Sequence, residues 1–228
     1  MILEKRRRTH LLPDEASIWI SISDLMAGLL IVFILTLTYY MLSYTEKTDQ
    51  ITKNQEIKEE IFNRIKTQMD ERNFTVRIDE KQWVLRMQDK VLFSSCSADM
   101  KKMGKTLIES LGEVMFSVFN IDKYHGSIET VFIEGHTDNY PPGTHCPFPS
   151  NWELSTQRAI NTWRVMSNKE PQLGSILNVN KEKLFSVSGY GETRPLVSNK
   201  TSSGREKNRR IDIRIAMIPP SKEKRPEP

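Results

Sequence analysis

Asp24 is the residue whose surroundings most directly suggest chemistry. It lies in the segment SISDLMAGLL, about two helical turns inside a long apolar run. A charged side chain in a bilayer costs roughly 2.5–3.5 kcal/mol even on the most lenient insertion scale, so it is kept where it faces a protein partner or a water-filled path. A carboxylate in such a place can bind and release a proton or a small cation, which is the role expected for Asp24.

The residues on the same helical face as Asp24 are small or polar. They recur at helical spacing on an otherwise apolar helix: Ser17, Ser21, Asp24 and Gly28. Small residues let a second helix approach closely, so this stripe is expected to face a helix bundle. The favoured interpretation of Asp24 is an ion carrier, for H⁺ rather than Na⁺. The alternative is a structural aspartate that hydrogen-bonds a partner helix or reaches the cytoplasmic interface.

The apolar run itself predicts one transmembrane helix over residues 18–44. It is long enough to cross a hydrocarbon core of roughly 30 Å, and the stretch from Leu25 to Leu42 contains no charge. A cleaved signal peptide is the alternative, but its apolar core is shorter and a small-residue cleavage site follows it. Here the apolar run ends in the aromatic segment YYML, and no such cleavage site follows it.

The charged residues predict the direction of the span. Four basic residues precede it, whereas the three that follow it are interspersed with acidic ones. Because positive segments stay inside, residues 1–17 are expected to be a cytoplasmic tail and the chain after Tyr44 to lie outside. Residues 219–228, rich in proline and charge, are expected to be disordered. The net charge of +4 comes with basic residues at both ends and without a basic, aromatic-lined face, so nucleic acid is not an expected partner.

Residues 45–73 predict a helical linker, because they are polar and contain no glycine or proline. Apolar residues recur about every four positions and form a narrow stripe: Ile51, Ile57, Ile61, Ile65 and Met69. Such a helix can extend the membrane helix outward, pair with a second copy as a short coiled coil, or stand alone as a solvated charged helix. The sequence leaves these three arrangements open.

Residues 74–218 predict an α/β domain. Strand patterns lie at Thr75–Met87, Glu129–Glu134, Lys183–Gly189 and Arg210–Met217, and helix patterns at Ala98–Phe119 and Asn151–Met166. Their alternation predicts a mixed sheet with helices packed on one face. The region has no nucleophile–base arrangement and no phosphate loop, since GYGE is not GxGxxG, so an enzyme is not expected.

Four ordered motifs in this region resemble the OmpA-like peptidoglycan-binding domain. They are GHTD, NWELSTQRA, GYGETRP and GREKNRRIDIRI, and they cover roughly Val84 to Ile218. The resemblance implies that Asp138 of the first motif and Arg158 of the second hold the diaminopimelate of the cell-wall peptide. The chemistry is suitable, because a carboxylate meets the ligand's ammonium and a guanidinium forks onto its carboxylate. The alternative is an internal salt bridge between Asp138 and Arg158 that orders the loop.

Other residues of these motifs are expected to shape the same pocket. The resemblance implies this role for Thr137, Asn151 and Leu154, and a helix that begins near Asn151 adds backbone donors for an anion. Arg209 and Arg210 match the NRR of the family. For these two arginines, a structural role in holding the sheet edge and contact with the ligand are both possible roles. The chain departs from the family in the longer loop after Asp138, which contains PPGTHCPFP and is expected to alter access or add a wall to the pocket.

The two cysteines, Cys96 and Cys146, both fall on the outer side of the predicted topology. Because the bacterial periplasm is oxidising, we expect a disulfide between them. The alternative is a metal site with His136 and His145, but the spacing matches no familiar zinc pattern. No metal and no cofactor are therefore expected.

The order of the parts resembles the B subunits of ion-driven stators, the family of flagellar MotB and of ZorB in Zorya anti-phage systems. The shared pattern is W-x-x-x-x-D (here Trp19 to Asp24), an apolar span, a short linker and a wall-binding domain. The resemblance implies a bacterial inner-membrane protein with a periplasmic C-terminal domain. It also implies two copies inside a ring of five MotA/ZorA-like A subunits, with H⁺ or Na⁺ passing at Asp24. The sequence D-L-M after the tryptophan and the short linker favour the Zorya branch. A flagellar stator subunit and a passive peptidoglycan tether are the alternatives.

Overall fold

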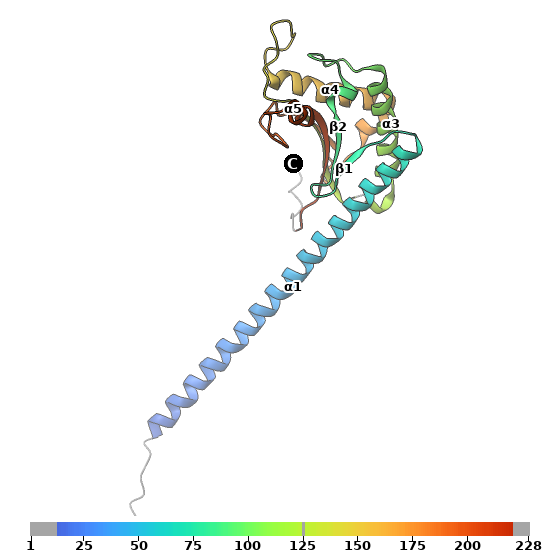
Figure 1. Ribbon diagram of the computed structural model, residues 1–228. Coiled ribbons are helices and arrows are strands. Elements are labelled where there is room, and N and C mark those ends of the chain that lie inside the picture. The colour runs from blue at the N-terminus through green and yellow to red at the C-terminus, as the bar shows by residue number, and fades with distance from the viewer. Residues whose placement is uncertain (1–12, 125, 221–228) are drawn as a thin grey trace, which may run out of the picture. The chain divides into compact units, whose positions relative to one another are not determined.

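The computed structural model describes residues 13–124 and 126–220 (Figure 1). Residues 1–12 of the tail predicted over 1–17 lie outside the described residues, and so do residues 221–228 of the tail predicted over 219–228. The chain divides into two compact units, one ending at Gln50 and one beginning at Ile51.

The first unit consists of the apolar part of helix α1, which spans Pro13–Glu71. Its large apolar side chains, from Ile18 to Leu42, are all exposed in the isolated chain. It is the one helix among the described residues that is long and apolar enough to cross a membrane, with a mean hydropathy of 2.3 in its most apolar window. The Thr36 and Thr38 hydroxyls donate hydrogen bonds of 2.6 and 2.8 Å to carbonyls four residues earlier. These polar groups are thus satisfied within the helix, as an apolar solvent requires.

The second unit is built on a five-stranded sheet in the order β1-β2-β5-β3-β4. The strands are β1 Arg77–Asp79, β2 Val84–Gln88, β3 Ile128–His136, β4 Phe185–Gly189 and β5 Arg210–Met217. Only the β3–β4 pair is parallel and the other three pairs are antiparallel. The predicted mixed sheet is confirmed. The long strand predicted over Thr75–Met87 is a hairpin of β1 and β2 instead, with Trp83 at a positive φ of 49° in its turn.

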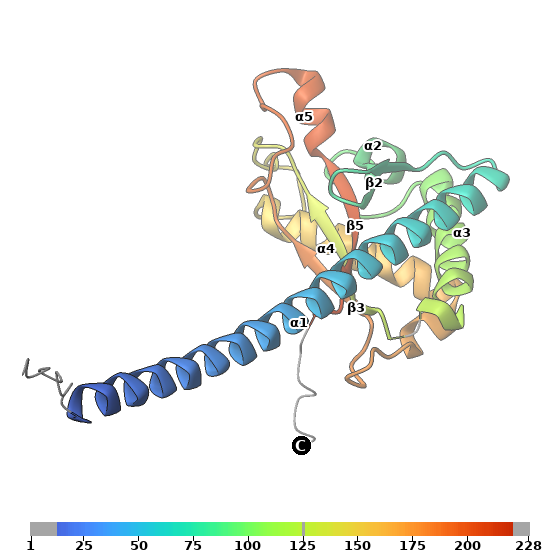
Figure 2. The same ribbon diagram turned by 90° about the horizontal axis from the view of Figure 1, so that it is seen from below.

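Helices α3 (Lys102–Phe119) and α4 (Asn151–Lys169) pack on one face of this sheet (Figures 1 and 2). The shorter helices are α2 (Asp89–Leu92), α5 (Ser202–Asn208) and the 3₁₀ turns η1 (Asp122–Tyr124) and η2 (Pro171–Ser175). Helix α5 lies in a segment that the sequence predicts to be a polar connection. It was missed because it is short and has no apolar stripe. The Thr201 side chain caps it by accepting a hydrogen bond from the Gly204 amide.

The two faces of the sheet differ in polarity, as the alternation along β5 illustrates. Ile211, Ile213 and Ile215 are buried in the apolar core under the helices. Arg210, Asp212 and Arg214 point to the opposite face, because successive side chains of a strand alternate. The core therefore lies on one side of the sheet, and a network of charged side chains lies on the other.

The end of α1 belongs to this core. Five of its apolar side chains are buried there: Ile57, Ile61, Phe62, Ile65 and Met69. Arg72, just after the helix, forms an ion pair of 2.6 Å with Glu113 of α3. The compact unit thus begins before residue 74, and the segment predicted as a linker over 45–73 contributes its second half to the domain. Four of the five residues of the predicted stripe, from Ile57 to Met69, are buried in this core, whereas Ile51 is exposed.

Truncating one of these side chains is expected to destabilise the domain. Ile61→Ala removes a fully buried side chain and is expected to lower the free energy of unfolding by about 3 kcal/mol, from lost burial and the cavity left behind. Chemical denaturation of the detergent-solubilised chain measures this. Ile51→Ala is the matched control, because Ile51 is 56% exposed in the same helix. Equal stability of the two variants would contradict the placement of α1 in the core.

Candidate functional site

All five residues predicted to hold the cell-wall peptide line one pocket of about 400 Å³: Thr137, Asp138, Asn151, Leu154 and Arg158. Strand β3 ends at His136, so the first two follow directly after it, and α4 begins at Asn151. Gly135 lets α4 lie close to β3, because a Cβ there would be 2.1 Å from the Ser155 carbonyl oxygen. The structure therefore brings together residues that the sequence separates.

Arg158 is fixed by three acceptors on the segment after β2. Its Nη1 pairs with Asp89 Oδ1 at 2.9 Å, its Nε donates to the Ser97 carbonyl at 2.8 Å and its Nη2 donates to the Ser94 carbonyl at 3.2 Å. Burial lowers the pKa of Arg158, and Asp89 counteracts this. A guanidinium has five N–H donors, so Arg158 can donate to these three acceptors and still donate to a carboxylate in the pocket.

Asp138 faces a different cation. One of its oxygens accepts a hydrogen bond of 2.9 Å from the Tyr140 amide, and the other forms an ion pair with Arg209. Asp138 and Arg158 do not pair with each other, so the alternative of a salt bridge between them is wrong. The pocket instead holds two neighbouring ion pairs, one formed by Asp89 and Arg158 and one by Asp138 and Arg209.

The remaining predicted residues shape the pocket around these pairs. The Asn151 side-chain amide donates to the carbonyls of Tyr140 at 2.9 Å and Asp138 at 3.2 Å, so it holds the loop entrance. The Thr137 hydroxyl is buried and has no hydrogen-bond partner among the described residues. The Thr137 amide donates to the Gly191 carbonyl, which ties the GHTD motif to the GYGETRP motif.

Sequence reasoning missed Asp89 as a member of the site. It lies at the start of α2, and burial raises its pKa, which Arg158 counteracts. No local pattern distinguishes it from a surface aspartate, because its partner is distant in sequence. With Lys101 and Arg209, it gives the pocket both signs of charge, which suits a zwitterionic ligand better than a simple ion.

Arg209 and Arg210, whose roles the sequence left undecided, lie in different parts of the domain. Arg209 lines the pocket beside Asp138. Arg210 is buried on the opposite side, where its Nε donates to Asp212 at 2.8 Å and its other nitrogens donate to the Asn208 and Arg194 carbonyls. Arg210 therefore has a structural role at the start of the central strand β5, whereas Arg209 lines the pocket.

Cys96 and Cys146 form a disulfide, with their Cα atoms 5.5 Å apart. Cys96 lies at the pocket and Cys146 in the long loop after Asp138. Because both thiols are used in this bond, the alternative of a metal site built from the cysteines with His136 and His145 is excluded. His136 lies in a separate cluster on the polar face of the sheet.

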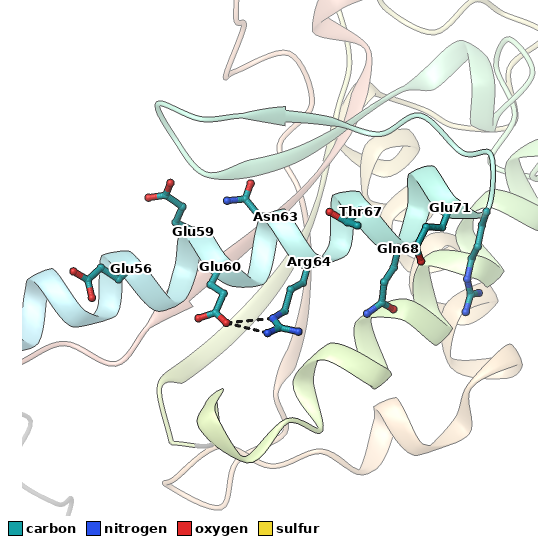
Figure 3. Close-up of a pocket in the computed structure, with 9 residues that line it drawn as sticks. Glu56, Glu59, Glu60, Asn63, Arg64, Thr67, Gln68 and Glu71 are labelled. Carbon is teal, nitrogen blue, oxygen red and sulfur yellow. Dashed lines mark hydrogen bonds and ion pairs between the residues drawn. The ribbon is translucent and has the colours of Figure 1, made fainter.

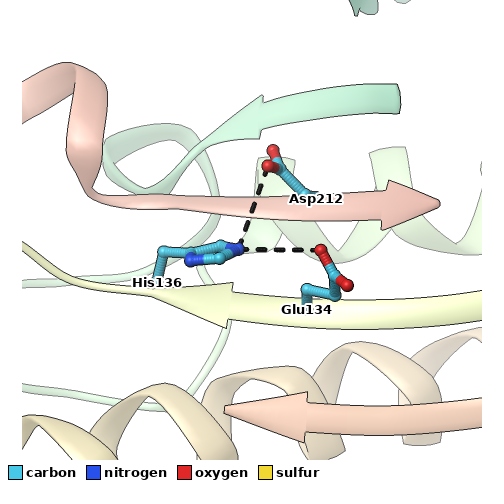
Figure 4. A group of neighbouring side chains, drawn as sticks. All are labelled: Glu134, His136 and Asp212. Atoms are coloured by element: carbon cyan, nitrogen blue, oxygen red, sulfur yellow. Dashed lines mark ion pairs between the residues drawn. The ribbon is translucent and has the colours of Figure 1, made fainter. Parts of the chain in front are cut away.

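That cluster consists of Glu134, His136 and Asp212 on β3 and β5 (Figure 4). The His136 Nε2 is 3.9 Å from an oxygen of each carboxylate. Both carboxylates are already matched by guanidinium groups, Glu134 by Arg214 and Asp212 by Arg86 and Arg210. Three guanidinium groups around two carboxylates disfavour a bound cation, so the cluster is best understood as a structural network.

The protonation of His136 is expected to make stability depend on pH. Burial lowers the pKa of His136, with Glu134 counteracting, so the folded protein binds this proton less readily than the unfolded chain. The free energy of unfolding should therefore fall as the pH drops below about 6.5, the unperturbed value for histidine. Denaturation curves between pH 7 and 5 measure this slope. His136→Gln should flatten it and the exposed His145→Gln should not; the same slope in both variants would contradict the assignment.

A larger hollow of about 860 Å³ runs along the exposed side of α1 and contains none of the predicted site residues (Figure 3). It is lined by charged and uncharged polar side chains, among which Arg64 and Glu60 pair at 3.2 Å. The hollow contains no convergent set of buried groups. The pocket at Asp138 and Arg158 is therefore the better candidate despite its smaller volume.

Comparisons with known proteins show which family and which relatives this chain resembles. Residues 105–209 match the OmpA family. Motility protein B of Bacillus subtilis is 31% identical over 159 residues, which are 70% of this chain and 54% of that protein. Zorya protein ZorB of Escherichia coli is 25% identical over 207 residues, which are 86% of each chain. Uncharacterized protein YtxE of B. subtilis is 33% identical, and the chain spans 60% of its length.

Two solved structures share the fold. A MotB-like protein from Desulfovibrio vulgaris superposes with a TM-score of 0.55 at 22% identity, covering 72% of this chain and 96% of that chain. The cell wall anchor of the T6SS from Pseudomonas aeruginosa gives a TM-score of 0.51 at 23% identity, covering 68% and 96%. Residues 105–209 thus match the OmpA family and follow an N-terminal apolar helix, in a chain that is similar to Motility protein B and to ZorB.

Proposed function

We propose that this chain is the B subunit of an ion-driven stator in the bacterial inner membrane, anchored to peptidoglycan. The observation that carries the proposal is a pocket of two ion pairs in an OmpA-family domain, in a chain whose apolar helix contains Asp24. The motility and Zorya relatives support a membrane-embedded machine. The cell wall anchor with the same fold supports attachment to the wall. No enzymatic activity is proposed.

The pocket is proposed to bind the diaminopimelate end of a peptidoglycan stem peptide. This group carries an ammonium and a carboxylate on one carbon, so Asp138 binds the first and Arg158 the second. In the ligand-free arrangement, Asp138 pairs with Arg209 and Arg158 pairs with Asp89. A guanidinium has five N–H donors and a carboxylate about four lone-pair sites, so each can bind the ligand's opposite charge beside its internal partner, and no buried charge is left without a partner.

The N-terminal helix is proposed to span the membrane once, with the N-terminus in the cytoplasm and the OmpA-family domain in the periplasm. Two copies of the chain lie inside a ring of five MotA/ZorA-like A subunits. Asp24 carries the ion, H⁺ in preference to Na⁺, while the two pockets hold the chain to the wall. In that arrangement the Ser17, Ser21, Asp24 and Gly28 stripe faces the A subunits, since small residues allow close helix contact.

The Zorya branch is favoured over the flagellar one by the lengths of the matches. The match with ZorB covers 86% of both chains, whereas the match with Motility protein B covers 54% of that protein. The short connection agrees, because the apolar run ends at Leu42 and the first buried core residue is Ile57. We therefore propose a role in anti-phage defence, with flagellar motility as the second candidate.

Deletion of the gene within its native operon tests this choice. Plating of phage and swimming in soft agar are measured in the same strains, with the deletion complemented by the wild-type gene. Defence predicts that phage plating rises to the level of cells without the operon while swimming is unchanged. Loss of swimming with unchanged plating assigns the chain to the flagellar motor and overturns the defence role.

A further inference from the structure

We propose that residues 139–150 form a wall of the peptidoglycan pocket that the Cys96–Cys146 disulfide holds in place, so that tight binding of the stem peptide requires the oxidised chain. The inference rests on the function proposed for the pocket. It assigns to the disulfide and to this loop a part in ligand recognition, in addition to the role of a covalent link between two segments.

The loop reaches the pocket through its first residues. Tyr140, Pro141, Pro142 and Gly143 all line it, directly after Asp138. The entrance of the loop is well held, because the Tyr140 amide donates to Asp138 and the Tyr140 carbonyl accepts from Asn151. The Tyr140 ring also lies under the Arg205 guanidinium, at 4.6 Å from its centroid. The wall therefore begins from a rigid corner.

Apart from the packing of its side chains, the middle of the loop is joined to the rest of the described domain by the Cys96–Cys146 disulfide. In the part of the chain that the structure describes, the hydrogen bonds of residues 141–149 stay within the loop, as from the Cys146 amide to the Gly143 carbonyl, apart from those of the disulfide itself. Prolines stiffen the loop locally but do not fix its position relative to the pocket. The disulfide at Cys146 is thus what places the wall.

The other end of the disulfide lies in the segment that fixes Arg158. Cys96 stands between Ser94 and Ser97, whose carbonyls accept hydrogen bonds from the Arg158 guanidinium. Cys96 also has a positive φ of 55°, which turns the chain sharply at this point. One covalent bond therefore joins the loop that follows Asp138 to the loop that holds Arg158, the two residues proposed to bind opposite charges of the ligand.

This arrangement has a direct consequence for affinity. A recognition loop that is mobile before binding must be ordered by the ligand, and a disulfide that orders it in advance removes that cost. The apolar core is built from other residues, and neither cysteine belongs to it. Opening the disulfide should therefore weaken binding of the stem peptide without unfolding the domain.

Binding of the detergent-solubilised full chain to purified diaminopimelate-type peptidoglycan sacculi, measured by co-sedimentation, tests the inference. The chain has two cysteines, so a reductant has this one disulfide as its target. Excess dithiothreitol delivers two electrons and two protons, breaks the S–S bond to give two thiols and becomes its own cyclic disulfide. Reduction is expected to weaken binding about tenfold, by the loss of preorganisation. The Cys96→Ser/Cys146→Ser variant should bind as weakly and be insensitive to reductant.

Two further variants separate the possible outcomes. Arg158→Ala reports on the pocket itself. Suppose that the wild type binds sacculi, that Arg158→Ala does not, and that reduction leaves binding of the wild type unchanged. The inference about the wall is then wrong, and the proposed function stands. Failure of the oxidised wild type to bind sacculi would overturn both. If circular dichroism shows that reduction unfolds the domain, the Pro142→Gly variant with its disulfide intact tests the inference instead. It should weaken binding roughly threefold by loosening the wall, and binding equal to wild type overturns the inference.

Discussion

Asp24→Asn is expected to abolish protection against phage while the protein remains in the membrane at its normal level. Asparagine keeps the size and polarity of aspartate but cannot take up and release a proton. If the ion passes at Asp24, the A-subunit ring can no longer be driven, and phage plating on cells that carry the native operon should rise to the level of cells without it. Efficiency of plating measures this, and immunoblotting of membranes confirms the amount of protein.

Ser21→Ala is the matched control for this experiment. Ser21 lies on the same stripe one turn earlier, and its hydroxyl donates to the Ser17 carbonyl within the helix at 3.0 Å. Removal of this hydroxyl should therefore leave protection unchanged. Full protection with Asp24→Asn, combined with its loss in Arg158→Ala, would show a passive wall tether with an incidental aspartate and would exclude the motor.

Arg158→Ala is expected to weaken binding to peptidoglycan sacculi about a hundredfold. The variant removes the group proposed to bind the ligand's carboxylate, and it leaves Asp89 buried beside an empty space. Truncating one partner of a buried charge pair typically costs about 2–5 kcal/mol of binding free energy. A hundredfold loss of affinity corresponds to roughly 2.7 kcal/mol, which lies within this range. Co-sedimentation of the full chain with sacculi measures the loss, and loss of phage protection should accompany it.

A second substitution on the same helix controls for general effects on charge. Arg164→Ala removes an arginine of α4 that is exposed and does not line the pocket, so binding should be unchanged. Arg158→Lys keeps the charge but not the planar fork, and is expected to recover only part of the affinity. Equal binding of wild type and Arg158→Ala, with both folded, would remove Arg158 from the site.

The sequence by itself determined those features that depend on local pattern. The uncharged run from Leu25 to Leu42 is long enough to span a membrane whatever surrounds it. The alternation of isoleucine with charged residues along β5 needs only a period of two to mark a strand with one buried face. The members of the pocket could be predicted because the four motifs have fixed order and separation, and Asp138 and Arg158 are read directly from them.

The tertiary structure decided which distant residues meet. A stripe at Ile57, Ile61, Ile65 and Met69 indicates that something covers one face of the helix, but the stripe is equally compatible with a second copy of the chain or with the domain itself. Asp89 looks like any other aspartate until the fold places it 2.9 Å from Arg158. The periodicity of a sequence indicates the direction in which a side chain points. The partner that the side chain meets depends on contacts between residues far apart in the chain, and a short sequence window does not contain both of them.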